Sequence, residues 1–274
     1  MSNYSYQKSI LDENLKTYNR QEFIASDPIQ IPHRFTKKED IEISAFLTSI
    51  IAWGNRKMII NNALRLMSLM NNSPYDFLLN SVPDYKNFDG KTPENLSQKS
   101  DWQAFKDFVH RTFNGYDCMF FLLSLKWIYC EFGGLEKVFT EGFNREKTIF
   151  SALQYFRSIF LQLPHAHRVE RHLSDVEKNS AAKRLNMFLR WLVRNDENGV
   201  DFGLWHGIPA SALMLPLDIH AGNVSRQLGI LTRKQNDWKA VEEVTAALRF
   251  FCPQDPIKYD FALFGAGVFQ NKEM

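Results

Sequence analysis

A lysine and an aspartate near the starts of two predicted helices are the side chains best placed to do chemistry. Lys183 lies in the first turn of a helix that is predicted to begin after the N-cap Ser180 and to end at Arg194. Asp218 stands in the run Leu-Pro-Leu-Asp-Ile-His at residues 215–220, at the start of another helix. Free backbone N–H groups at a helix start keep such a carboxylate ionised. Because both helices flank one short segment, we expect the amine and the carboxylate to face a common cleft.

Positive charge is concentrated in the same part of the chain. Lys183, Arg190 and Arg194 are spaced so that they lie on one line of their helix, opposite its apolar stripe. Between residues 165 and 194, seven Lys and Arg face three acidic residues, a local charge of +4 in a chain whose net charge is +2. Contact with phosphates requires a cationic patch of this kind. An ordinary solvated helix face gives the same pattern.

Asp218 admits two other interpretations. An aspartate at a helix start often only caps that helix. Together with His220 and a serine such as Ser211 it could also form a hydrolase triad. No Gly-x-Ser-x-Gly elbow and no strand precede that serine, so the triad is disfavoured.

Recognised metal and cluster motifs are absent from the sequence. Three histidines follow one another closely, at His165, His167 and His172, but no acid stands at a known ligand spacing from them. Three cysteines, Cys118, Cys130 and Cys252, are odd in number and far apart. They exclude a disulfide framework, a CxxC zinc site and a four-cysteine iron–sulfur cluster. We therefore expect no metal and no cofactor.

The elements that must position these groups are helical almost throughout. Apolar residues recur at helical spacing over the ranges 39–53, 57–70, 105–113, 118–132, 148–161, 181–194, 219–229, 238–251 and 256–268. Asp237 and the pair Asp255-Pro256 are typical helix starts. Residues 71–103 are rich in polar residues and predict a long, mostly polar loop with at most one short helix. Strand alternation is scarce. The sequence predicts an all-α fold.

Length and composition set outer limits on the protein. The 274 residues suffice for one large domain or two smaller ones, and 45% of them are hydrophobic, including 23 phenylalanines. Such a chain can bury a sizeable core, which excludes disorder as a description of the whole. No apolar run approaches the ~18 residues of a membrane helix, and the first residues lack the apolar core of a signal peptide. We expect a cytoplasmic protein without a membrane segment.

Two stretches of the chain resemble the helix-hairpin-helix (HhH-GPD) superfamily of DNA glycosylases, to which endonuclease III belongs. Residues 40–70 are similar to its opening helices. Residues 180–194, followed by the run at 215–220, are similar to its lysine-bearing helix and its Pro/Val-Asp-x-His segment. The resemblance covers about residues 37–70 and 178–268.

The number of residues between the lysine and the aspartate resembles that of one branch of this superfamily. Lys183 and Asp218 are 35 residues apart, which is more than in endonuclease III and similar to the archaeal 8-oxoguanine glycosylase (AGOG) branch. Arg190-Trp191 and the ending Asp-Pro-Ile-Lys-Tyr-Asp-Phe-Ala-Leu at residues 255–263 also look like an uncharacterised bacterial family placed near that branch.

The resemblance implies a two-lobed all-α fold with a central cleft. One lobe would be a helical barrel of residues 37–195 that carries the lysine helix, and the other would combine residues 1–36 with residues 196–274. The implied activity is base-excision repair by a DNA glycosylase with AP lyase activity, on an oxidised purine such as 8-oxoguanine. Lys183 would attack C1′ of the sugar to give a Schiff base, and Asp218 would stabilise the positive charge that builds on the sugar.

The resemblance also implies a DNA interface. Contacts with DNA are expected from Arg168, Arg171, Arg184, Arg190, Arg194, Asn55 and Arg56, and contacts with the target base from Trp53 and His220. The partner would be damaged double-stranded DNA, bound by a monomer. Two departures stand out. The Gly-rich hairpin before the lysine is replaced by Val-Glu-Lys-Asn-Ser-Ala-Ala at residues 176–182, and the cysteines of an iron–sulfur cluster are missing.

An attacking lysine must be uncharged, and this sets a physical condition on the site. An ordinary lysine pKa near ~10.4 has to fall to roughly 7–8, at about 1.4 kcal/mol per pH unit. A helix start supplies only ~0.3–1 kcal/mol. Desolvation must supply most of the remainder, helped by the like charges of Arg184 and Arg190. The hypothesis predicts Lys183 in a water-poor cleft.

Two rival functions fit the same residues. In the first, the fold is retained for binding DNA or RNA structures, and Lys183 contacts a phosphate without any chemistry. In the second, the chain is an interaction protein that uses a Phe-rich surface. A large exposed apolar patch and a cleft without positive charge would favour the second.

Overall fold

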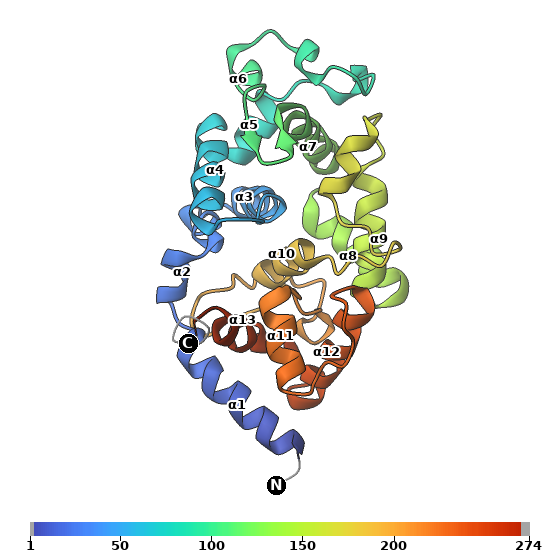
Figure 1. Ribbon diagram of the computed structural model, residues 1–274. Helices are drawn as coiled ribbons and strands as arrows, with labels where there is room; N and C mark the ends of the chain where they lie inside the picture. Colours follow the sequence, from blue (N-terminus) through green and yellow to red (C-terminus); the bar gives the residue numbers. More distant parts are fainter. Residues whose placement is uncertain (1–2, 270–274) are drawn as a thin grey trace. The chain divides into compact units, whose positions relative to one another are not determined.

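The computed structural model describes residues 3–269 and is mainly helical (Figure 1). The chain divides into two compact units. Unit 1 comprises Met1–Ser26 and Asp175–Met274, and unit 2 comprises Asp27–Ser174. The all-α prediction is confirmed apart from two short strands in unit 2.

The division of the chain differs from the predicted lobes at both boundaries. Residues 27–36 belong to unit 2, and residues 175–195 belong to unit 1. Residues 175–195 belong to unit 1 because the helix that carries Lys183 forms buried ion pairs with carboxylates further along the chain. Lys183 and Asp218, which were expected in different lobes, therefore lie in the same unit.

Unit 2 starts with two 3-10 turns and three helices. These elements are η1 (Pro28–Gln30), η2 (Pro32–Arg34), α3 (Lys38–Ile50), α4 (Arg56–Leu69) and α5 (Pro74–Asn80). The break between α3 and α4 falls at Gly54 and Asn55, as predicted. Asn55 caps α4, because its Oδ1 accepts a hydrogen bond from the Met58 N–H at 3.2 Å.

Residues 71–103 hold more structure than the mostly polar loop with at most one short helix that is predicted for them. Besides α5 they contain η3 (Tyr85–Asn87), η4 (Pro93–Leu96) and α6 (Ser100–Gln103). Trp102 is fully buried, and its indole N–H donates to the Pro93 carbonyl at 2.8 Å. One buried aromatic side chain thus organises a segment whose composition is otherwise polar.

The helix predicted over residues 105–113 does not form, and this prediction is wrong. The two strands lie here instead, as an antiparallel hairpin of β1 (Val109–His110) and β2 (Phe113–Asn114). Arg111 in its turn has a left-handed backbone, with φ of 55°. Phe105 and Phe108 are fully buried, so the apolar spacing that predicts a helix comes from an irregular segment that packs into the core.

The second half of unit 2 is a group of helices around an aromatic core. Its elements are α7 (Gly115–Trp127), the π-helical turn η5 (Ile128–Phe132), α8 (Leu135–Glu146), α9 (Ile149–Phe160) and η6 (His167–His172). Helices α8 and α9 lie side by side (Figure 1), and the rings of Phe139 and Phe156 stack at 4.2 Å. No predicted helix corresponds to α8, which follows two glycines and starts without a side-chain cap.

Long apolar helices are one way to recognise a membrane segment. Among residues 3–269, no single helix has the length and apolar character to cross a membrane, although the bent pair of Gly115–Phe132 and Leu135–Glu146 passes the same test when taken together.

Unit 1 joins the N-terminal arm to the C-terminal part of the chain. Its elements are α1 (Asn3–Tyr18), α2 (Glu22–Ser26), α10 (Lys183–Val193), η7 (Ala210–Ala212), α11 (Ile219–Gln227), α12 (Trp238–Phe251), η8 (Pro256–Tyr259) and α13 (Asp260–Phe269). Two predicted caps are confirmed. Asp218 accepts from the Ala221 N–H at 2.9 Å to cap α11, and Asp237 accepts from the Ala240 N–H at 3.1 Å to cap α12.

Helix α13 packs against both α1 and α11 (Figure 1). A Cβ at Gly265 would lie 2.2 Å from the ring of Tyr18 in α1, and a Cβ at Gly267 would lie 2.9 Å from the Cβ of His220 in α11. Atoms cannot approach this closely, so only glycine fits at either position. The two glycines serve close packing of three helices.

Candidate functional site

Lys183 is the first residue of α10, and the residue before it has an unusual backbone. Ala182 has φ of 46° and ψ of 34°, the left-handed conformation, although its side chain is a methyl group and not the hydrogen of glycine. The predicted cap Ser180 instead accepts a hydrogen bond from the Ala182 N–H at 3.3 Å through its hydroxyl. A non-glycine residue in this conformation is strained, and such strain clusters at functional sites.

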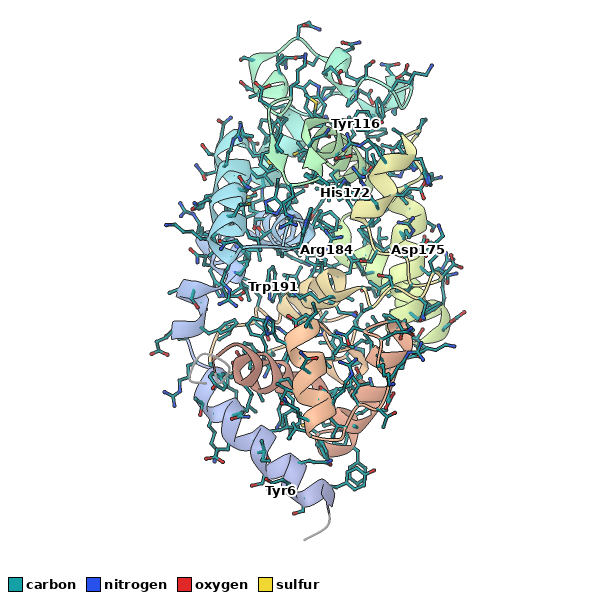
Figure 2. All side chains as sticks on the ribbon, in the orientation of Figure 1. Tyr6, Tyr116, His172, Asp175, Arg184 and Trp191 are labelled. Carbon is teal, nitrogen blue, oxygen red and sulfur yellow. The ribbon has the colours of Figure 1, made fainter. Side chains whose placement is uncertain are left out.

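A compact turn of residues 175–182, here named the α10 turn, leads into this helix. Asp175, labelled in Figure 2, accepts the Glu177 N–H at 3.2 Å through its side chain and the Ser180 N–H at 3.1 Å through its carbonyl. Asn179 is left-handed as well, with φ of 62°. The α10 turn therefore has two left-handed residues directly before the lysine helix.

The α10 turn is attached to the start of α12. The Asn179 amide donates to Asp237 Oδ2 at 2.9 Å, and the Trp238 N–H donates to the Asn179 carbonyl at 3.2 Å. Arg233 Nε donates to Asp237 Oδ1 at 2.6 Å. Asp237 thus caps α12, pairs with Arg233 and holds the α10 turn.

Asp237→Ala is expected to lower the melting temperature in a pH-dependent way. The hydrogen bond from Arg233 holds the pKa of Asp237 at about 2, below the ~3.9 of an unfolded aspartate. Stability from a lowered carboxyl pKa is present above pH ~4 and is lost as the pH falls toward 2. Thermal unfolding of both proteins from pH 7 to pH 2 should show a difference that shrinks below pH 4. A difference that stays constant would contradict this role of the ion pair.

Lys183 and Asp218 both act on one carboxyl group of unit 1. Both side chains are half-buried. Burial raises the pKa of Asp260, the first residue of α13, to about 6; the negative charge of Asp218 adds to the rise, and the positive charges of Arg190 and Lys183 oppose it. Asp260 is buried and paired with Arg190 Nη1. Lys183, Asp218 and Asp260 therefore all belong to unit 1.

Asp218 is half-buried, and the two residues that follow it are exposed. Its carbonyl accepts the Asn236 amide N–H at 2.9 Å, and its Oδ1 is used in the cap of α11. The next residue, Ile219, is 70% exposed, which is unusual for a large apolar side chain. His220 is exposed too, and its ring lies 6.4 Å from that of Phe264 in α13. The stretch after Asp218 offers an apolar and an imidazole side chain to solvent.

Arg190 and Arg194 do not belong to a solvated cationic face, which corrects the assignment of both to DNA binding. They are only 5% and 4% exposed. Arg190 Nε donates to Asp201 Oδ1 at 3.2 Å, and Arg194 Nη1 donates to Asp201 Oδ2 at 2.8 Å. Arg194 Nε also binds Asp255, at 2.9 Å. The helical spacing places both side chains correctly on one face, but carboxylates from other segments cover that face.

The remaining predicted cations are divided between the two units. Arg168 and Arg171 belong to unit 2, where Arg168 donates to Asp117 Oδ2 at 3.0 Å and Arg171 is exposed. Arg184 belongs to unit 1 and comes directly after Lys183 on α10. Trp191 lies further along the same helix (Figure 2). Burial lowers the pKa of Arg184 to about 10. The stretch from residue 165 to 194 is therefore not one continuous patch on one unit.

Trp53, Asn55 and Arg56 gather at the turn between α3 and α4 in unit 2. The Trp53 ring meets the His110 ring edge-on at 4.9 Å and lies nearly parallel to the His172 ring at 6.2 Å. Asn55 caps α4, and Arg56 is the first residue of that helix. His220, the other residue predicted for the base pocket, belongs to unit 1. The structure thus brings three of these four residues together.

The histidines considered as metal ligands have separate partners. His165 Nδ1 lies 2.7 Å from the Leu163 carbonyl, and His167 Nδ1 lies 2.7 Å from Glu170 Oε1. His172 Nε2 lies 3.2 Å from Asp117 Oδ2. Over the described part of the chain, no group of three or more His, Cys, Asp and Glu side chains has the arrangement of a metal site.

Comparison with known proteins gives a family. A family model described as protein of unknown function (DUF2400) matches residues 27–269. The chain belongs to this family. The match includes all of unit 2 and the segment from α10 to α13, and it leaves residues 1–26 outside. No curated protein and no solved structure matched the chain.

The predicted site residues do not include Asp260 and Asp201, the carboxylates that pair with Arg190. Asp260 did carry a signal, because it is the one charged residue of the otherwise apolar α13 segment Asp-Phe-Ala-Leu-Phe-Gly-Ala-Gly-Val-Phe. A charged residue at the edge of such a segment needs a buried partner or a route to solvent. Asp201 lies in an irregular segment, where no periodicity indicates burial.

Proposed function

We propose that this protein is a DNA base-excision glycosylase with AP lyase activity, acting on an oxidised purine such as 8-oxoguanine. The observation that carries the proposal is that Lys183, at the start of α10, and Asp218, at the start of α11, are both half-buried and belong to the same unit. The resemblance to the HhH-GPD superfamily supplies the fold, the reaction and the substrate class. Damaged double-stranded DNA is the proposed partner, and a monomer without an iron–sulfur cluster is the proposed state.

In the proposed reaction, the Lys183 amine forms a bond to C1′ as the bond from C1′ to the base breaks. Positive charge builds on the sugar during this step, and the Asp218 carboxylate stabilises it. Opening of the sugar ring then gives a Schiff base between Nζ of Lys183 and C1′. The Schiff base makes the neighbouring C–H acidic, so that β-elimination cleaves the strand.

The α10 turn supports the comparison with the superfamily hairpin. It precedes the lysine helix directly, as the hairpin does. Asn179 and Ala182 have the left-handed backbone for which glycine is the usual residue. The turn can therefore follow a hairpin-like path without the glycines that the sequence lacks.

Fewer of the predicted arginines are available to contact DNA than the sequence suggests. With Arg190 and Arg194 buried, the proposal leaves Arg168, Arg171 and Arg184 as candidates for phosphate contact. The target base has to leave the stack, which costs a few kcal/mol and less for a damaged base. The exposed Ile219 next to Asp218 is an apolar group that can contact the opened duplex.

A second candidate function is binding of DNA or RNA structure without chemistry. Asp218 supports this alternative because it caps α11. This structural role is enough to explain an aspartate at this position, without any role in chemistry. Lys183 would then contact a phosphate as an ordinary cation.

Borohydride trapping separates the two functions. Wild-type protein is incubated with duplexes that carry 8-oxoguanine or one of several other lesions, and borohydride reduces any Schiff base to a stable adduct. We expect a covalent adduct on at least one lesion and none on undamaged duplex. Binding to damaged duplex without an adduct on any lesion would contradict the glycosylase–lyase and support the second function.

A further inference from the structure

A cavity of about 610 Å³, here named the unit 1 cavity, lies within unit 1. It is lined by three segments that are far apart in the sequence, within residues 15–20, 194–198 and 252–258. Its volume is within the range of about 300–1,000 Å³ that is usual for ligand pockets. Neither Lys183 nor Asp218 lines this cavity, so it is separate from the residues of the proposed reaction.

The lining of the unit 1 cavity is strongly polar. Among the described residues, Leu15 and Cys252 are the only lining side chains that are neither charged nor amides. The lining includes no aromatic ring, which a nucleobase would need for stacking. The cavity is therefore suited to a small and strongly polar ligand.

The most buried lining residues, here named the cavity floor, are Asn19, Arg194 and Asp196, with 7%, 4% and 7% of their surface exposed. Arg194 is fixed by two carboxylates, because its Nε donates to Asp255 at 2.9 Å and its Nη1 donates to Asp201 at 2.8 Å. Asp196 accepts from the Asn19 amide at 3.2 Å. The cavity floor is thus arranged before a ligand binds, which lowers the cost of binding.

The cavity floor favours hydroxyl groups as its partners. Asp196 and Asp255 already pair with Arg194, at 3.7 and 2.9 Å, so a neutral donor suits them better than a second cation. Asn19 Oδ1 is buried and accepts no hydrogen bond from the described residues, which leaves an acceptor for a donor from outside the chain. A hydroxyl both donates and accepts, so it can bond to carboxylates, an amide and a guanidinium alike.

Three more exposed cations, here named the cavity rim, complete the lining. Lys16 and Arg20 are exposed, and Lys258 is half-buried. Arg20 Nε donates to the Lys16 carbonyl at 2.9 Å, and Lys258 Nζ lies 4.9 Å from the centre of the Tyr259 ring. Neither contact neutralises the cation. With the exposed Glu197, three positive charges and one negative charge leave a surplus of +2. A phosphate group carries about −1.5 to −2 at pH 7 and matches this surplus.

We propose that the unit 1 cavity binds a phosphorylated sugar, with the phosphate at the cavity rim and the sugar hydroxyls at the cavity floor. Inorganic phosphate would leave the hydrogen-bonding groups of the floor unused. An unphosphorylated sugar would leave the positive charge of the rim without a partner. The proposal goes beyond the proposed function and does not depend on it, because the two use different residues.

The first experiment is a calorimetric titration of the whole chain with a panel of small ligands. The panel holds pentose and hexose phosphates, among them ribose 5-phosphate, together with ribose and inorganic phosphate. At least one sugar phosphate should bind about tenfold or more tightly than ribose and than inorganic phosphate, because it makes hydrogen bonds with charged groups at both ends. Absence of binding by every sugar phosphate, or equal affinity for inorganic phosphate, would overturn the proposal.

Lys258→Gln tests the cavity rim without touching the core of unit 1. Loss of one cation should weaken the bound sugar phosphate by about tenfold. Lys239→Gln is the matched control, because Lys239 is an exposed lysine of the same unit that does not line the cavity. It should bind as the wild type does. An unchanged affinity in Lys258→Gln, or an equal loss in both variants, would contradict a phosphate at the rim.

Asn19→Ala tests the cavity floor. It removes the amide but leaves the rim cations in place, so the affinity for inorganic phosphate should stay the same while the affinity for the sugar phosphate falls. Thermal unfolding establishes that the variant is folded. A merely structural role of Asn19 predicts that both ligands weaken together. That result, or an unchanged preference for the sugar phosphate, would overturn the assignment of the floor to the sugar.

A DNA end with a 5′-phosphate presents the same two groups, sugar and phosphate, and competition separates the two sources. Undamaged duplex with 5′-phosphates is added to the protein after the sugar phosphate has bound. We expect the small ligand to stay bound, and we expect Lys258→Gln to form the borohydride adduct at the wild-type level. Displacement by the duplex would overturn a small-molecule site in favour of a DNA contact. Binding of the sugar phosphate by a protein that forms no adduct would overturn the proposed function alone.

Discussion

Lys183→Gln is expected to abolish the borohydride-trapped adduct and to reduce strand cleavage by roughly a thousandfold or more, because an amide cannot form a Schiff base. Glutamine is a good helix former of similar length, so the first turn of α10 should persist. Trapping and strand cleavage are measured on the same lesion duplex. Binding of that duplex should change little, since a single exposed or half-exposed cation contributes modestly to affinity.

Lys178→Gln is the matched control for this substitution. Lys178 lies five residues earlier, in the α10 turn, and its side chain is 75% exposed. Its removal takes away the same charge from the same region of unit 1. We expect full adduct formation in this variant. An adduct that survives in Lys183→Gln, or that is lost equally in both variants, would exclude Lys183 as the nucleophile.

Asp218→Asn is expected to reduce base excision by about 10²–10³-fold while leaving the fold nearly unchanged. Asparagine caps a helix about as well as aspartate, so the hydrogen bond to the Ala221 N–H can be kept. The substitution removes the negative charge alone, and a preorganised charge at the developing cation accounts for a loss of this size. Single-turnover excision gives the activity, and denaturant unfolding gives the stability.

Asp218→Ala completes this comparison. It removes the charge and the cap together, and loss of a cap costs about 1 kcal/mol of stability. We expect the two variants to be equally inactive and to differ in stability. Wild-type excision by Asp218→Asn would reduce Asp218 to a cap and would favour the binding protein as the function.

The C-terminal helices could be predicted from the sequence because their signals are local. Asp218 and Asp237 precede apolar runs and cap the helices that follow, as the sequence predicts. Lys183 begins α10, close to the predicted start, although Ala182 and not Ser180 is the N-cap. Capping and helical periodicity need only neighbours within a few residues, so one sequence contains all the information.

The partners of α10 could not be predicted because they come from distant parts of the chain. The helical spacing correctly puts Arg190 and Arg194 on one line, yet it cannot indicate that Asp201 and Asp260 cover that line. Asp260 is 70 residues from Arg190 along the chain. Such ion pairs between distant parts of the chain determine whether an arginine is solvated or buried. They also join the lysine helix to unit 1.

The hairpin of β1 and β2 shows the same limit in unit 2. Buried Phe105 and Phe108 have a spacing that is compatible with a helix. The strands are only two residues each, so they are too short to show an alternation of apolar and polar residues. The turn between them has a left-handed backbone at Arg111, where the sequence has no glycine to indicate it. Here the tertiary packing of the aromatic side chains outweighs the local pattern.

The residue that carries the trapped sugar is the most direct evidence on the proposed mechanism. Wild-type adduct on a lesion duplex is digested with nuclease and protease, and mass spectrometry locates the modified amine. We expect the modification on Lys183, in a peptide from the start of α10. An adduct on another lysine or on the N-terminal amine, or no adduct on any lesion, would contradict the assignment of Lys183 as the nucleophile.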